Sequence, residues 1–94
     1  MTTTTTPSPE TFLATMNGFQ RTAALKAGVE LEVFTAIGEG VDTAAAMAAR
    51  CAASERGIRI LCDYLTVIGL LAKADGRYRL TPDSAAFLDK RSPA

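Results

Sequence analysis

The 94-residue sequence has no histidine and no tryptophan, and it has only two cysteines. Without histidine, a serine or cysteine nucleophile lacks the base that most often activates it. Cys51 and Cys62 form no metal or disulfide spacing pattern and fall in apolar helical stretches, which predicts buried free thiols in a reducing compartment. We expect four aspartates in turns, caps and solvated faces: Asp63, Asp75, Asp83 and Asp89. The sequence therefore predicts no catalytic, metal or cofactor site of its own.

The chain also has no net charge and no long apolar run. Ten basic residues balance ten acidic ones, and no stretch approaches the roughly 18 to 20 apolar residues of a membrane span or forms a signal peptide. We expect a soluble, cytoplasmic protein that does not enter a membrane.

The one G-x-G motif, Gly38-Glu39-Gly40, follows a predicted helix rather than a strand. It therefore predicts a turn and not a phosphate-binding loop.

The stretch from Ser54 to Leu80 predicts a helix that leads into a β-hairpin. Ser54 is a good N-cap, and Gly69 ends the helix. Asp75-Gly76 supplies the positive φ angles of a tight hairpin turn. The apolar face of the helix consists of Ile58, Leu61, Cys62, Leu65 and Ile68.

Further helices are predicted on both sides of this stretch. Thr43 is a candidate N-cap for a helix from Ala44 to about Ala52, and a short helix is expected from Val29 to Ile37. Thr81-Pro82 opens a last helix, which we expect to bury Ala85, Ala86, Phe87 and Leu88. Two helices joined by a short turn and followed by a β-ribbon predict a mainly α fold, a winged helix-turn-helix with a two-stranded β-wing.

An additional helix is predicted at the N-terminus. Residues 1–9 are threonine-rich and are expected to form a disordered tail, and residues 10–94 are expected to form the winged-helix domain. A helix from Glu10 to about Ala27, with Gly28 as its C-cap, places four residues on one face: Phe12, Met16, Phe19 and Ala23. This face is either ordinary core or an interface, and we favour the interface because the other elements already supply a core. Gly18 predicts either a kink or the close approach of another backbone.

A winged helix often binds DNA, and this alternative remains open at this point. The helix from Ser54 to Ile68 has no net charge, and the hairpin brings the unit only to +2. Phosphate-driven binding depends on a concentrated positive face. A transcriptional regulator would have to use Arg56, Arg59, Arg77 and Arg79. An adaptor that docks on a different protein is a third possibility.

Three runs of the sequence resemble a known family. They are AALKAGVELEVFTAIGEG at Ala23 to Gly40, SERGIRILCDYLTVIGLLAKADGRYRLTP at Ser54 to Pro82, and SAAFLDKRSPA at Ser84 to Ala94. Together they resemble the N-terminal dimerisation domain of S-adenosylmethionine-dependent small-molecule O-methyltransferases. The resemblance covers nearly all of the chain after Glu10. It rests on the V-E-L-x-V-F, R-I-L-x-D-Y-L, G-L-L and T-P motifs in one order.

The resemblance implies a homodimerisation and substrate-lid module that is not catalytic by itself. In the family this domain interlocks with a second subunit, does not bind DNA and forms part of the pocket for a small-molecule acceptor. Phe12, Met16 and Phe19, with Ala23, would then lie on the dimer seam or near the partner's pocket. S-adenosylmethionine binding and methyl transfer belong to a following Rossmann-like domain, which these 94 residues do not contain. No catalytic or cofactor-binding residue is carried over, and the chain is expected to be a fragment or a free-standing module.

Overall fold

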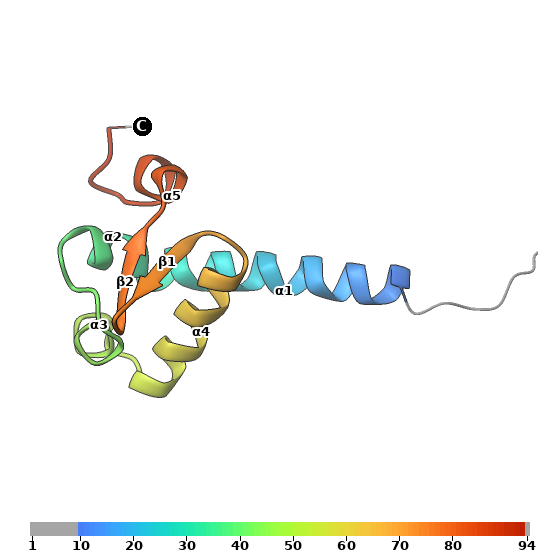
Figure 1. The fold of residues 1–94 in the computed structure, drawn as a ribbon, viewed down its shortest axis with the longest axis horizontal. Coiled ribbons are helices and arrows are strands. Elements are labelled where there is room, and N and C mark those ends of the chain that lie inside the picture. The colour runs from blue at the N-terminus through green and yellow to red at the C-terminus, as the bar shows by residue number, and fades with distance from the viewer. Residues whose placement is uncertain (1–9, 94) are drawn as a thin grey trace, which may run out of the picture.

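The computed structural model describes residues 10–93, with side chains from Gly18 onward. The predicted tail at residues 1–9 lies outside this range. In chain order the elements are α1 (Glu10–Leu31), α2 (Val33–Gly38), α3 (Ala44–Cys51), α4 (Glu55–Val67), β1 (Leu71–Ala74), β2 (Arg77–Leu80) and α5 (Pro82–Phe87). Figure 1 shows α2, α3, α4 and the hairpin grouped together, with α1 running out to one side and α5 next to the C-terminus.

The predicted winged helix is confirmed. Helices α3 and α4 are joined by a short turn, and α4 leads into the antiparallel pair β1–β2, in which Leu71 faces Leu80 and Lys73 faces Tyr78. The wing is also tied to the loop before α3, because the Tyr78 N–H donates to the Asp42 carbonyl at 2.8 Å. The fold is thus mainly helical, with one two-stranded sheet in residues 10–93.

The core lies where α2, α3 and α4 meet the inner face of the hairpin. The predicted inner face of α4 is confirmed, since Ile58, Cys62 and Leu65 are buried and Leu61 and Ile68 pack beside them. The remaining buried apolar residues come from the other elements: Val33, Phe34, Ala36, Ile37, Met47, Ala48, Leu71 and Tyr78.

The predicted helix caps and the hairpin turn are confirmed as well. The side chains of Thr43, Ser54 and Thr81 each accept a hydrogen bond from a backbone N–H three residues further on. Asp75 and Gly76 have φ angles of 53° and 74°, as a tight hairpin turn requires. Local sequence chemistry therefore determines where these elements begin and turn.

The boundary predicted between the first two helices is wrong. Gly28 is not a C-cap, because α1 continues through it to Leu31. The break falls at Glu32, which has a left-handed backbone conformation with φ of 62°. Glycine at position 28 favours the end of a helix, but tertiary packing outweighs that preference.

Gly28 allows close packing of other side chains against α1 and does not end the helix. A Cβ atom at this position would lie 2.9 Å from Phe34 Cε2 and 3.3 Å from Leu65 Cδ1. The missing side chain therefore lets Phe34 and Leu65 approach the backbone of α1. At Gly18 the helix also continues, and no atom of the described chain lies within 4 Å of a Cβ built there.

The prediction for the last helix is partly wrong. Phe87 is 74% exposed and Ala85 is exposed, whereas the polar Ser84 is fully buried. The reason is the capping box: Ser84 exchanges hydrogen bonds with Thr81, which turns this position of α5 inward. Ala86 and Leu88 are partly buried.

The described chain is elongated because α1 extends beyond the other elements. Its radius of gyration is 16.4 Å, and its extents are 56 × 30 × 24 Å. A compact domain of this length has a radius of gyration of about 12 Å. Figure 1 shows no other described element beside the N-terminal half of α1.

Replacing Gly28 with alanine tests the close packing in the core. We expect the free energy of unfolding of Gly28→Ala to be about 1–3 kcal/mol lower than that of Gly18→Ala, because both variants gain helix propensity but only the methyl at residue 28 overpacks against Phe34 and Leu65. Urea denaturation measures this. Gly18→Ala is the matched control: it lies in the same helix with open space around it, and alanine there adds up to about 1 kcal/mol. A Gly28→Ala variant as stable as Gly18→Ala would contradict the packing explanation.

Candidate interaction site

An open, largely apolar groove runs between α1 and α4. It has a volume of about 520 Å³. Its walls are Phe19, Gln20, Ala23 and Ala24 on α1 and Gly57, Ile60, Leu61 and Tyr64 on α4. Two elements far apart in the sequence therefore form one surface hollow with few polar groups.

Large apolar side chains at and beside this groove remain exposed. Phe19 is 71% exposed, Ile60 is 60% exposed and Val67 is 81% exposed. Ile60, Tyr64 and Val67 recur at helical spacing along α4, on a different face from the buried residues Ile58, Cys62 and Leu65. An apolar surface made by two elements is typical of an interface.

Two of the four predicted interface residues are found at this groove. Phe19 and Ala23 line it and are exposed. Phe12 and Met16 belong to the same helix, but their side chains lie outside the described residues. The sequence interpretation missed the contribution of α4, because it assigned that helix a single apolar face. The repeat of Ile60, Tyr64 and Val67 was the signal for a second face.

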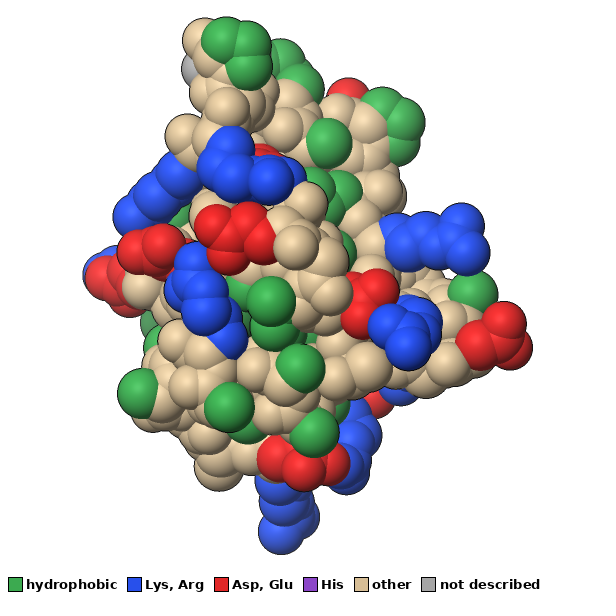
Figure 2. Space-filling view, turned by 90° about the vertical axis from the view of Figure 1, so that its left-hand side faces the viewer, with side chains coloured by type: hydrophobic (Ala, Val, Ile, Leu, Met, Phe, Trp, Pro, Cys, Tyr) green, Lys and Arg blue, Asp and Glu red, His purple; other side chains and the backbone are tan. Residues whose placement is uncertain are grey.

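Several charged side chains of the described residues pair with charges of opposite sign. Among the arginines a DNA-binding protein would need, Arg59 pairs with Glu55 at 2.9 Å and Arg77 pairs with Asp42 at 2.9 Å. Figure 2 shows basic and acidic side chains interspersed on the face it draws. The groove side of α4 is apolar. DNA binding is therefore not the function that this surface favours.

A polar cluster joins the wing to α4. The Tyr78 hydroxyl donates to Asp63 Oδ1 at 2.5 Å, and Lys73 Nζ lies 2.8 Å from the same oxygen and 4.9 Å from the centre of the Tyr78 ring. The hydrogen bond from Lys73, together with that from Tyr78, lowers the pKa of Asp63. Burial, followed by the bond to Asp63, raises the pKa of Tyr78. Asp63 is thus an anchor for the wing and not only a solvated charge.

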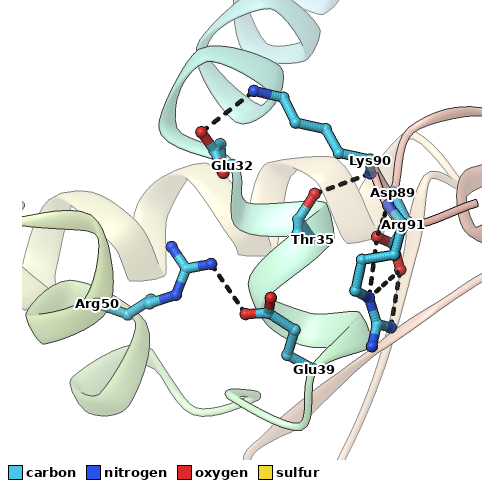
Figure 3. A network of polar contacts seen from close by, with 7 residues as sticks. All are labelled: Glu32, Thr35, Glu39, Arg50, Asp89, Lys90 and Arg91. Atoms are coloured by element: carbon cyan, nitrogen blue, oxygen red, sulfur yellow. Dashed lines mark hydrogen bonds and ion pairs between the residues drawn. The ribbon is translucent and has the colours of Figure 1, made fainter.

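A second polar cluster holds the C-terminal segment against α2. Figure 3 shows Lys90 reaching Glu32 and Thr35, and Arg91 folding back on Asp89. The Lys90 N–H donates to Thr35 Oγ1 at 3.0 Å, and Arg91 Nη2 lies 3.0 Å from Asp89 Oδ2. These bonds from Arg91 lower the pKa of Asp89.

Asp89, one of the four aspartates expected in turns, caps and solvated faces, begins a turn to Ser92 but is only 8% exposed. It lies against Gly38, where a Cβ atom would clash with its carboxylate. Its partner Arg91 lies two positions further on, in a segment that forms neither a helix nor a strand. The sequence therefore offered no sign that the carboxylate would be buried.

The two cysteines are free, and Cys62 is buried. Burial raises the pKa of Cys62 to about 12 and also raises that of the half-buried Cys51. A thiolate nucleophile is therefore disfavoured at both positions. The described residues contain no cluster of three or more potential metal ligands, and none of their helices is long and apolar enough to span a membrane.

A winged helix with an extended first helix and an apolar groove on its described surface is typical of a domain that associates with other protein. The comparison with protein families makes this assignment specific. Residues 13–90 match the O-methyltransferase dimerisation domain, and the chain belongs to this family.

Similar proteins are O-methyltransferases of greater length. The chain is 38% identical over 82 residues to 3-hydroxy-5-methyl-1-naphthoate 3-O-methyltransferase of Streptomyces sahachiroi, which covers 87% of this chain and 23% of that protein. A crystal structure described as an O-methyltransferase of Nostoc punctiforme is 54% identical with a TM-score of 0.83, covering 95% of this chain and 27% of that one. Human N-acetylserotonin methyltransferase, in complex with S-adenosylmethionine, is 30% identical with a TM-score of 0.80, covering 99% and 29%. The chain thus spans about a quarter of the length of these relatives.

Thiol modification tests the burial of Cys62. With a pKa of about 12, only about one Cys62 thiol in ten thousand is ionised at pH 8. We expect a thiol reagent to modify Cys51 in the folded protein while Cys62 reacts only after unfolding in urea. The variants Cys51→Ala and Cys62→Ala each leave one cysteine, so that the modification of each thiol is measured separately. Rapid reaction of folded Cys51→Ala protein would contradict the assigned burial.

Proposed function

We propose that this chain is a homodimerisation and substrate-lid module of a small-molecule O-methyltransferase, formed by residues 10–94 as one domain and not catalytic by itself. The observation that carries the proposal is the exposed apolar surface shared by α1 and α4. It coincides with half of the residues that the sequence assigns to the dimer seam, Phe19 and Ala23. Membership in the dimerisation-domain family supports the same conclusion.

The extension of α1 supports association with a second copy. Isolated helical segments shorter than about 12–15 residues are marginal in water, so the projecting half of α1 gains stability from a surface to pack on. Burying the exposed side chain of Phe19 contributes about 1.5–3 kcal/mol. In a two-fold dimer each such contact occurs twice. The Phe12, Met16, Phe19 and Ala23 faces of two copies would then pack together.

The groove supports the substrate-lid part of the proposal. Small-molecule sites are concave and mostly apolar, with few polar groups, and the α1–α4 groove has this character. It is open to solvent on one side, so this chain would supply one wall of an acceptor pocket that other parts of the enzyme complete. The named relative that acts on a hydroxynaphthoate makes an aromatic acceptor a suitable occupant.

The described residues support a non-catalytic role. The chain contains no histidine, and burial keeps the thiol of Cys62 protonated. We assign S-adenosylmethionine binding and methyl transfer to the portion that relatives have outside the matched segment. The human relative is known with this cofactor bound.

Two free cysteines agree with a reducing location such as the cytoplasm.

Light scattering of wild type and Phe19→Asp tests dimerisation. We expect the wild-type chain to have the mass of a dimer, and Phe19→Asp to weaken association at least tenfold, since a charge would have to be buried on the seam. The matched control is Phe87→Asp, which changes the same residue type at a similar exposure (74% against 71%) on α5. It should remain dimeric. A wild-type monomer at high concentration, or a folded Phe19→Asp dimer, would refute the assigned seam.

Titration with a hydroxynaphthoate tests the lid. We expect backbone amide NMR shifts to change at Gly57, Ile60 and Tyr64, because an aromatic acceptor prefers the apolar groove. Binding should be weak, since only one wall of the pocket is present. Ile60→Asp should abolish these changes while Val67→Asp, outside the groove, preserves them. Shift changes spread evenly over the surface would count against a groove that binds acceptors.

A further inference from the structure

The C-terminal segment after α5 lies across α2. Residues 89–91, which we call the strap, contact both the start and the middle of this helix (Figure 3). Lys90 Nζ lies 3.1 Å from Glu32 Oε2, directly before α2, and the Lys90 N–H donates to Thr35 Oγ1 at 3.0 Å. These two bonds join residues that are 58 and 55 positions apart in the sequence. Helix α2 is therefore held from outside by a segment that is distant along the chain.

The strap also reaches the far end of α2, at Gly38. A Cβ atom at this position would clash with the Asp89 carboxylate and would lie 2.6 Å from Arg91 Nη2. The backbone of Gly38 does not have a positive φ angle, so no special conformation requires a glycine here. What this glycine provides is the space that the Asp89 carboxylate occupies.

The helix that the strap holds is short and follows a strained residue. Helix α2 has six residues, and a helix of this length does not form by itself in water. Glu32, just before it, has a left-handed conformation with φ of 62° and ψ of 34°, and its side chain makes no capping hydrogen bond. A non-glycine residue keeps this conformation only where its surroundings hold it there. Lys90 of the strap supplies one of the contacts that do so.

The bend at Glu32 connects the strap to α1. Helix α1 ends at Leu31 and α2 begins at Val33, so a single residue turns the chain. Beyond the bend, the Phe34 ring lies against the backbone of α1 at Gly28. Any displacement of α2 would therefore reach the last turns of α1.

We propose that the strap is a conformational lock that holds the Glu32 bend and so fixes the end of α1 relative to the core. With the strap engaged, α1 leaves the core in a single direction. With the strap released, the bend opens and the last turns of α1 fray. The consequence for association rests on the proposed function: Phe19 and Ala23 lie on the helix whose direction the lock sets, so release also weakens dimerisation. The lock itself requires no second copy.

Hydrogen exchange in a Gly38→Ala variant tests the lock. This substitution displaces the strap without altering any residue of the strap, because the added methyl meets the Asp89 carboxylate, whereas alanine favours the α2 helix itself. The Ala36 amide donates to the Glu32 carbonyl at 2.9 Å, and we expect its exchange to become about tenfold faster. The Tyr78 amide of the wing reports on the core and should keep its wild-type exchange rate.

Two control variants separate the strap from other effects of an added methyl. Gly18→Ala adds the same group to α1 in open space and should leave both exchange rates unchanged. In an Asp89→Ala background the methyl at residue 38 meets no carboxylate, and the Arg91 side chain is free to move away. Gly38→Ala should then change the Ala36 rate by less than about twofold.

Unchanged exchange at Ala36 in Gly38→Ala protein would overturn the proposal. So would an equal acceleration at Ala36 and Tyr78, because the substitution would then have lowered the stability of the whole domain. Light scattering of the same variant tests the link to association: with a dimeric wild type we expect about fivefold weaker association, and an unchanged dimer would overturn that link. A monomeric wild type would refute the dimer proposal, while the exchange rates would still decide whether the lock exists.

Discussion

The rest of the structure depends on the contact among Gly28, Phe34 and Leu65. A glycine in the middle of α1 costs about 1 kcal/mol in helix propensity, but it lets the Phe34 ring and Leu65 approach the helix backbone. This contact joins α1, α2 and α4 at one point of the core. It therefore determines the direction in which α1 leaves the winged helix. The groove beside Phe19 and the extended half of α1 are consequences of that direction.

The same core separates two surface grooves, a largely apolar one between α1 and α4 and one beside α5 that polar residues also line. Phe19 lies with Ile60 on the α1–α4 side, whereas Phe87 lies with Val29 on the α5 side. Neither phenylalanine contributes to the buried cluster. A small domain gains stability by burying its large aromatic residues, so exposure of two of its four phenylalanines is consistent with surfaces that partners cover.

Polar interactions engage two basic side chains of the wing. Lys73 is engaged with Asp63 and Tyr78, and Arg77 with Asp42. These bonds use basic side chains of the wing to fix it to α4 and to the loop before α3. The side of α4 that faces the α1–α4 groove is apolar, with Ile60, Leu61 and Tyr64. Winged helices often bind DNA, but in this chain α4 contributes apolar side chains to the α1–α4 groove.

The sequence by itself determined the local elements and the family. The caps at Thr43, Ser54 and Thr81, the turn at Asp75-Gly76 and the inner face of α4 were predictable because each depends on residues a few positions apart. That Phe19 and Ala23 lie on the same side of α1 was predictable because they are four positions apart in a helix. Only the tertiary structure decided that α1 passes through Gly28, that Asp89 is buried beside Gly38, and that Phe87 is exposed while Ser84 is not. Those outcomes depend on contacts between segments distant in the chain, and no local pattern encodes them.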